Sequence, residues 1–122
     1  MILVDSSVWI DHLRVTDFTL SHYCEIGMVA THPFVIGELS LGSLRNRAGV
    51  LGALKELPQV SVARDEEVVG LIERYGLFGL GIGYIDAHLL AAVCLTPGSR
   101  LWTRDKRLLA AAERAAADIL SE

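Results

Sequence analysis

The sequence has few of the features that build secreted, membrane-embedded or zinc-bound proteins. Its two cysteines, Cys24 and Cys94, lie far apart, and no CxxC pair occurs. This usage excludes a zinc finger, and it fits reduced thiols in the cytoplasm better than a secreted disulfide framework. No apolar run approaches the roughly 18 residues that a membrane span needs, and no basic leader opens the chain. We therefore expect a cytoplasmic protein without a membrane contact.

Positive charge is also scarce. Eleven Lys and Arg stand against fifteen Asp and Glu, which gives a net charge of -4 at pH 7. Without a general positive field, any contact with nucleic acid must come from local features. Apolar residues, by contrast, make up 52% of the 122 residues. A chain of this length and composition can bury a core of its own, so we expect one domain over residues 1–122.

Short apolar runs alternate with longer segments of helical spacing. Strands are predicted over residues 2–4, 28–31, 60–62 and 100–103. Helices are predicted after residue 5, over 34–44, ending near 57, over 65–75, over 84–95 and from about 106. Such alternation is typical of an α/β domain with a short, mainly parallel sheet flanked by helices.

Three largely apolar segments each hold a single carboxylate. Asp5 is the only charged residue of 1–10, Glu38 of 34–44, and Asp86 of 77–95 if His88 is counted as neutral. An unpaired carboxylate is expensive to bury, so each must find a cation, a proton or several hydrogen bonds. Three such groups in one small domain suggest that they share one solution.

The predicted sheet provides a place where these acids can meet. Asp5 ends the first strand, and Asp105 follows the last one by two residues. In open α/β sheets, ligands bind at this carboxyl edge. Carboxylates gathered around one point repel one another unless a divalent cation sits among them, and oxygen ligands select Mg²⁺ or Mn²⁺ over zinc. The pattern therefore predicts a metal site.

Four strings of the chain resemble, in order and spacing, the PIN domain of the VapC toxins, the ribonuclease halves of toxin-antitoxin pairs. The strings are ILVDSSVWIDHLR, VIGELSLG, GIGYIDAHLLAA and LWTRDKRLLAAAE, and each carries one of the acids. The resemblance covers essentially the whole chain. It implies a single PIN-like domain with a four- or five-stranded sheet, a Mg²⁺- or Mn²⁺-dependent endoribonuclease activity, a homodimer and a small antitoxin that occupies the active site.

The same resemblance implies roles for individual residues. Asp5, Glu38, Asp86 and Asp105 become the catalytic quartet, with the metal held mainly by Asp5 and Asp86. The metal would activate a water that attacks the phosphodiester and leaves 5'-phosphate and 3'-hydroxyl ends. Thr103 and Arg104 lie beside the quartet and are expected to position the substrate, which in this family is transfer, ribosomal or messenger RNA.

Two local basic groups can hold RNA phosphates beside the acids, although ordinary surface charge explains each of them as well. They are Arg45 with Arg47, and Arg100 with Arg104, Lys106 and Arg107. The four histidines show no pairing at ligand spacing, and we expect them on the surface or in the core.

Other readings exist for each acid and for the whole chain. Asp5 and Asp105 are suited to cap helices, and Asp86 to face a helix dipole. Glu38 fits such a local role least, because its neighbours are apolar.

A phosphate-accepting receiver domain is disfavoured because residues 39–64 contain no aspartate. A dehalogenase-type phosphatase is disfavoured because Ser7 stands where its second aspartate would be. A catalytically silent PIN-like module that binds a protein or RNA partner remains the alternative.

Overall fold

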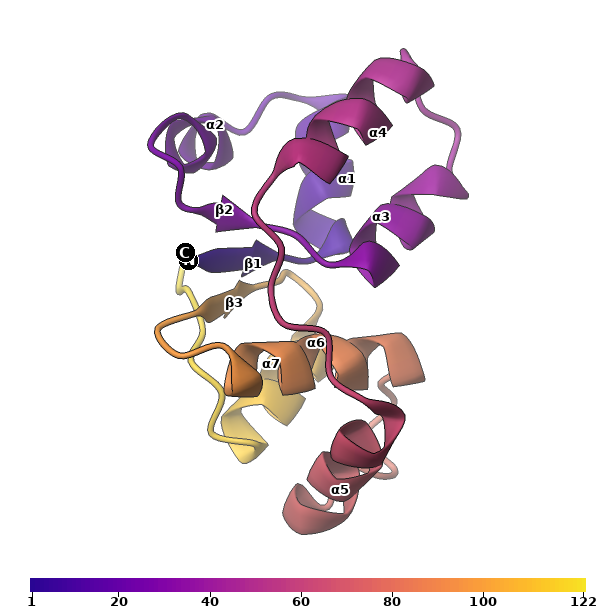
Figure 1. Cartoon of the computed structure of the whole chain (residues 1–122), viewed down its shortest axis with the longest axis vertical. Helices are drawn as coiled ribbons and strands as arrows, with labels where there is room; N and C mark the ends of the chain where they lie inside the picture. Colours follow the sequence, from indigo (N-terminus) through magenta and orange to yellow (C-terminus); the bar gives the residue numbers. More distant parts are fainter.

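A small parallel sheet lies at the centre of the protein. The computed structural model describes residues 1–122 and contains β1 (Ile2–Val4), β2 (Val29–Ala30) and β3 (Arg100–Trp102). The strand order is β2-β1-β3, and β1 pairs in parallel with both neighbours (Figure 1). All three residues of β1 are fully buried. Their unbroken apolar character is what a central parallel strand covered on both faces requires.

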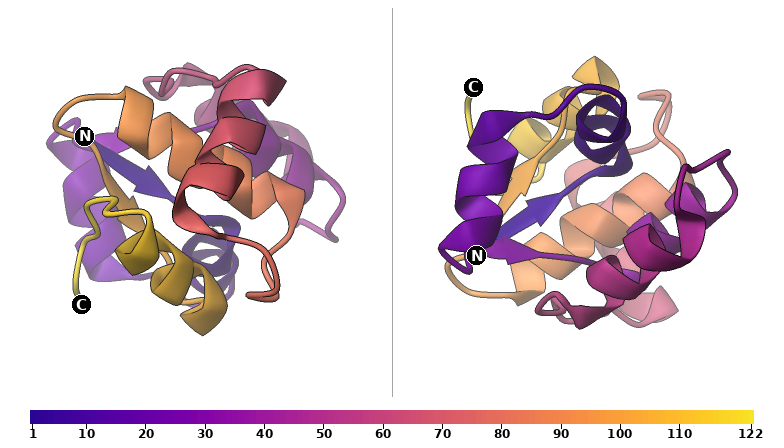
Figure 2. Two further views of the ribbon diagram at one scale, coloured as in Figure 1. Left: turned by 90° about the horizontal axis from the view of Figure 1, so that it is seen from below. Right: turned by 90° about the horizontal axis from the view of Figure 1, so that it is seen from above.

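Seven helices surround this sheet. They are α1 (Ser6–Arg14), α2 (Phe18–Glu25), α3 (Pro33–Ser40), α4 (Arg47–Glu56), α5 (Asp65–Tyr75), α6 (Tyr84–Leu95) and α7 (Lys106–Arg114). In Figure 1, α1 to α4 gather around the β2 side of the sheet, and α5 to α7 around the β3 side. Figure 2 shows helices on both faces of the sheet. None of the helices is both long and apolar enough to cross a membrane.

The sheet has three strands, whereas four or five were predicted. At one edge, the expected strand over 60–62 is reduced to a single parallel bridge between Thr31 and Gln59. Pro58 has no N–H to extend the ladder, and the N–H of Ser61 turns away to the hydroxyl of Thr96. At the other edge, one bridge joins Leu101 to Ile119. Both edges are therefore covered by short segments of chain that pair only once.

Most helices were predicted correctly, and one was missed. The expectations for α5, α6 and the start of α7 are confirmed, whereas α3 ends at Ser40 instead of continuing to residue 44. Helix α2 was not predicted. It buries only Leu20, so its sequence carries almost no apolar periodicity. Its start is marked by Asp17, which accepts a hydrogen bond from the N–H of Leu20.

Helix α6 anchors the core next to the sheet. Its residues from Ala87 to Val93 are all buried, so it is covered on every side. It contributes Leu89 and Leu90 to the main core, which also contains β1 and Trp102. Ala87 and Ala91 pack separately with Val68 of α5. A helix fixed in this way holds the start of α6, including Asp86, in a defined place relative to β1.

Replacing Leu3 tests how much the central strand contributes to the stability of the fold. We expect Leu3→Ala to lower the free energy of unfolding by about 2–5 kcal/mol, because it opens a cavity where no solvent reaches. Leu41→Ala is the matched control, since Leu41 is 89% exposed and its loss should cost no more than about 0.5 kcal/mol. Urea unfolding measures both values, and equal costs would contradict the assignment of β1 as the core.

Candidate active site

Four elements bring the predicted acids to one edge of the sheet. Asp5 directly follows β1, and Asp105 follows β3 at the start of α7. Glu38 lies in α3, and Asp86 lies in the first turn of α6. The charge of Asp5 contributes to the raised pKa of both Glu38 and Asp86, and the charge of Asp105 contributes to that of Asp86, so each of the four side chains lies within electrostatic reach of at least one other. The structure thus gathers residues that are distant in the sequence.

Asp5 is almost completely buried and is held by two hydroxyl groups. Its side chain is only 4% exposed. Ser7 and Thr103 both donate hydrogen bonds to its Oδ2, at 2.7 and 2.8 Å. Its Oδ1 accepts no hydrogen bond, and the side chain does not cap α1. The arrangement fixes the carboxylate through one oxygen and leaves the other one free for a ligand.

The two hydroxyls also tie the start of α1 to the segment after β3. Ser7 Oγ accepts a hydrogen bond from the backbone N–H of Arg104 at 3.0 Å, and Thr103 Oγ1 accepts one from the N–H of Asp105 at 3.1 Å. Thr103, predicted to position substrate, is buried against Asp5. The role of Ser7 was missed, although its place two residues after the acid that ends a strand offered the signal.

Glu38 and Asp86 are partly buried, and each resists ionisation. Burial is the main cause that raises the pKa of Glu38, and the charges of Asp5 and Asp86 add to it. A long contact of 3.5 Å from the Ser6 hydroxyl to Glu38 Oε1 acts in the opposite direction. Burial is also the main cause that raises the pKa of Asp86, with smaller contributions from the charges of Asp5 and Asp105.

Asp86 and Asp105 also stabilise the starts of their helices, which was the alternative role expected for each of them. Asp86 Oδ2 accepts a hydrogen bond from the N–H of Gly83 at 3.3 Å, which closes the first turn of α6. Asp105 is exposed, and its Oδ1 caps α7 by accepting from the N–H groups of Arg107 and Leu108. Each contact uses one oxygen only, so the capping and ligand-binding interpretations are compatible.

Arg104 is occupied by other carboxylates. Its guanidinium forms ion pairs with Asp11 at 2.9 Å, with Asp17 at 2.6 Å and with Glu122 at 2.6 Å. In this structure it therefore connects α1, the start of α2 and the end of the chain, and it does not present a free cation to a substrate. Another ion pair joins Arg64 to Glu67, and His88 Nε2 lies 3.3 Å from Asp65 Oδ1. None of them reaches the quartet.

The histidines lie outside this group of acids, and none hydrogen-bonds to it. His32 is fully buried, and its Nδ1 accepts a hydrogen bond from the N–H of Phe34 at the start of α3. Burial, together with the nearby His88, lowers the pKa of His32 to about 4. His32 therefore stays neutral at physiological pH and helps to position the helix that carries Glu38.

The donor set of the quartet fits a hard divalent cation. All its available ligand atoms are carboxylate oxygens, which Mg²⁺ and Mn²⁺ prefer, and no Lys or Arg neutralises them. The structure contains no group of three or more His, Cys, Asp or Glu side chains that could hold a metal ion. Mg²⁺ does not require such a group, because it commonly keeps several waters and binds through one or two carboxylates.

Comparison with known proteins decides the family. No family model matches the chain. The chain is 50% identical over 111 residues to Ribonuclease VapC32 of Mycobacterium tuberculosis, in strains CDC 1551 / Oshkosh and ATCC 25618 / H37Rv. The match covers 91% of this chain and 90% of each relative. The chain belongs to the VapC family. It is therefore a PIN-domain ribonuclease toxin, and the resemblance carried by the four strings is confirmed.

Burial of Glu38, together with repulsion within the quartet of this VapC protein, predicts a dependence of stability on pH. The pKa of Glu38 is higher in the folded protein than in the unfolded chain, so the unfolded chain releases this proton at a lower pH. The free energy of unfolding therefore falls as the pH rises through the folded-state pKa. In EDTA, Glu38→Gln should therefore raise the melting temperature at pH 7 and weaken the fall from acidic to neutral pH. Glu25→Gln, on the exposed surface of α2, should change neither. Equal melting curves for both variants would contradict the repulsion.

The buried hydroxyl of Thr103 predicts a second effect. Thr103→Val keeps the size of the side chain but removes the donor to Asp5, so we expect a loss of about 1.5–3 kcal/mol in the free energy of unfolding. Thr103→Ser keeps both hydrogen bonds and should be the more stable variant of the two. Urea unfolding measures this difference. A valine variant as stable as the wild type would mean that Thr103 does not hold Asp5.

Proposed function

We propose that the protein is an endoribonuclease that uses Mg²⁺ or Mn²⁺, with Asp5, Glu38, Asp86 and Asp105 as its catalytic residues. The observation that supports this proposal best is the cluster of four carboxylates without a cationic partner, two of which have a raised pKa. A protein keeps such a repulsive group only if something else compensates for it. A divalent cation would offset this repulsion. It would also allow the phosphodiester of RNA, which is itself an anion, to approach the carboxylates.

The role of each acid follows from the carboxylate oxygen that its contacts within the protein leave free. We assign the cation mainly to Asp5 and Asp86, through the Oδ1 atoms that the contacts with Ser7, Thr103 and Gly83 leave available. When bound, the cation would polarise the phosphodiester and activate a water. Glu38 and Asp105 orient further waters, or a second ion, from the two sides. Ser7 and Thr103 keep Asp5 in one orientation and so reduce the reorganisation that the reaction needs.

The chemistry that follows is hydrolysis. The water oxygen forms a bond to phosphorus, the bond from phosphorus to the 3'-oxygen breaks, and the leaving 3'-oxygen takes up a proton. The products carry 5'-phosphate and 3'-hydroxyl ends. A ribonuclease with paired histidines would instead form a cyclic phosphate by attack of the 2'-hydroxyl. His32 and His88 are buried and make no hydrogen bond to the quartet, which favours the hydrolytic route.

The proposed partners are an RNA substrate, a small antitoxin and a second copy of the chain. Because transfer, ribosomal and messenger RNA are cytoplasmic, we place the enzyme in the cytoplasm as well. Protein contacts are supported by large apolar side chains that the single chain leaves uncovered, and Phe18 and Leu41 are 82% and 89% exposed. Such side chains are commonly found where partners bind.

Cleavage of total bacterial RNA tests the assignment. With Mg²⁺ or Mn²⁺ the wild type should produce discrete cuts with 5'-phosphate ends, and EDTA should abolish them. We expect Asp5→Asn and Asp86→Asn to lower the rate by more than about a hundredfold, as the loss of preorganised electrostatic groups does in other enzymes. The matched control is Asp118→Asn, which removes an exposed aspartate outside the quartet and should keep full activity.

Two outcomes would contradict this proposal. Wild-type turnover by Asp5→Asn or Asp86→Asn would remove these residues from the site. If wild type and variants are folded, free of antitoxin and equally inert with every metal, the protein is a catalytically silent module that acts by binding. Mapping the new 5' ends names the RNA and the cleavage position in the same experiment.

A further inference from the structure

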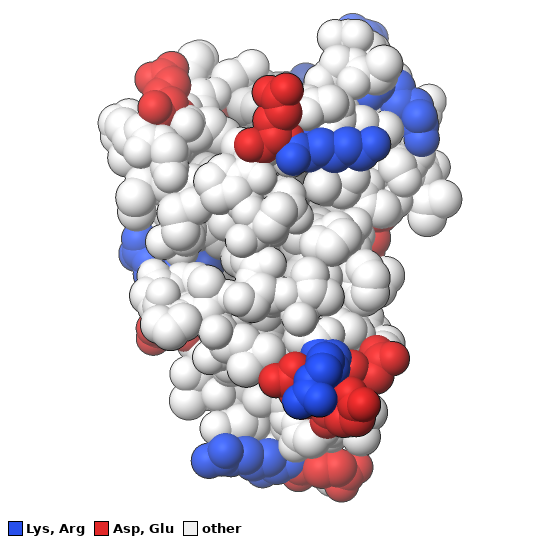
Figure 3. Space-filling model, in the orientation of Figure 1, with Lys and Arg blue, Asp and Glu red and all other residues white.

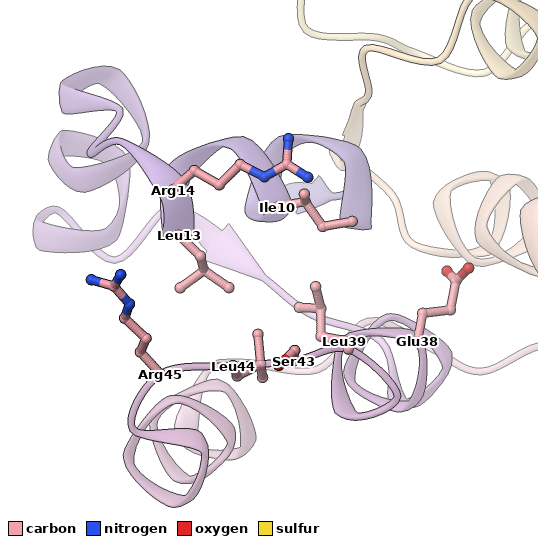
Figure 4. Close-up of a pocket in the computed structure, with 9 residues that line it drawn as sticks. Ile10, Leu13, Arg14, Glu38, Leu39, Ser43, Leu44 and Arg45 are labelled. Carbon is pink, nitrogen blue, oxygen red and sulfur yellow. The ribbon is translucent and has the colours of Figure 1, made fainter.

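A pocket of about 620 Å³ opens beside the quartet and has no role in the chemistry described so far. It lies between α1 and the connection from α3 to α4 (Figure 4). Glu38 stands at one end of this pocket, and Arg45 stands at the other. Arg14 extends along α1 above it. The pocket, which we call the arginine groove, is therefore continuous with the acidic site through Glu38.

The two arginines of the groove are free cations. Arg14 and Arg45 are both exposed, and neither takes part in an ion pair or a side-chain hydrogen bond. Arg104, by contrast, is saturated by three carboxylates. Figure 3 shows basic side chains gathered around the α3 to α4 connection at the upper right. Two unpaired guanidinium groups along one groove are well suited to anions, because each offers a planar fork of N–H donors.

The floor of the groove is apolar. It includes Ile10, Leu13 and Leu44, and the first two are 42% and 38% exposed. A surface with cations at the rim and apolar side chains at the floor matches the two parts of a nucleotide, its phosphate and the flat face of its base. The faces of bases are available only where RNA is unpaired, in loops, bulges and single strands. The same surface would not match a regular duplex, whose bases are stacked.

We infer that the arginine groove binds an unpaired segment of the RNA substrate next to the bond that is cut, with Arg14 and Arg45 on its phosphates. This inference rests on the proposed function, since it needs the scissile phosphate at the quartet. Charge complementarity and the continuity through Glu38 support RNA as the occupant. Arg14 and Arg45 are positioning residues, because they lie along the groove away from the reacting atoms. They determine how a substrate is held and not how fast a held substrate reacts.

Binding of RNA as a function of salt concentration tests the groove. The probe is a fluorescein-labelled single-stranded RNA of mixed sequence, followed by anisotropy in EDTA over a series of KCl concentrations. Each lost phosphate contact should reduce the slope of log K against log[KCl] by about 0.7. Arg14→Gln and Arg45→Gln should each show this reduction and bind about five- to tenfold more weakly at low salt. Arg14→Lys and Arg45→Lys keep the charge and should keep the slope.

Arg74→Gln is the matched control. Arg74 is an exposed arginine without an ion pair, and it lies on α5 at the opposite end of the molecule (Figure 1). It should keep both the affinity and the slope of the wild type. In cleavage assays, Arg14→Gln and Arg45→Gln should raise KM and leave kcat nearly unchanged. A structural defect would instead lower kcat or the melting temperature.

Other outcomes overturn the inference. If the groove variants keep the wild-type slope, or if Arg74→Gln changes it equally, the groove does not bind RNA. If they keep the slope but lose binding to the cognate antitoxin or to a second copy, the groove is a protein-binding surface. Because binding is measured without metal and without cleavage, these results are independent of whether the quartet proves to be a metal-dependent nuclease.

Discussion

Repulsion between carboxylates is the constraint on which the rest of this structure depends. Asp5, Glu38, Asp86 and Asp105 are held together without a single lysine or arginine paired to them. The pKa values of Glu38 and Asp86 are raised mainly by burial and further by this repulsion. Only a rigid frame can keep like charges in place. The fully buried strand β1 and the fully covered middle of α6 form that frame, and the site stands at their ends. The stability of the core therefore serves to hold an arrangement that is unfavourable by itself.

Asp5, Asp86 and Asp105 each use one carboxylate oxygen for a contact within the protein. Asp5 gives Oδ2 to two hydroxyls, Asp86 gives Oδ2 to the start of α6, and Asp105 gives Oδ1 to the cap of α7. In each case the second oxygen accepts no hydrogen bond from the protein. A helix cap and a catalytic carboxylate are thus not competing explanations for such a residue. The cap orients the side chain through one oxygen and leaves the other without a hydrogen bond from the protein.

The features that were predicted depend on residues close together in the sequence. Several of the features that were missed depend on contacts between residues far apart in the sequence. Isolated acids in apolar segments signalled Asp5, Glu38 and Asp86, and the acids of its first turn signalled α5, because both signals depend on neighbouring residues. Helix α2 was missed because it buries little beyond Leu20, and the sheet was overestimated because its edges pair only once. The ion pairs of Arg104 join residues that are far apart in the sequence, so no local pattern could indicate that this cation is already occupied. The same limit applies to the hydrogen bond between Thr103 and Asp5, whereas Ser7 lies only two residues after Asp5.

The order of the strands has a consequence for the protein during its own synthesis. The central strand β1 is made before the helices α1 to α6, but one of its two neighbours, β3 (Arg100–Trp102), is made only after them. Asp5 likewise depends on the hydroxyl of Thr103, and Asp105 comes later still. Contacts of such long sequence separation form only after the intervening chain is available. The central sheet and the hydrogen bonds that hold Asp5 are therefore completed only after β3 and Thr103 have been synthesised and have left the ribosome.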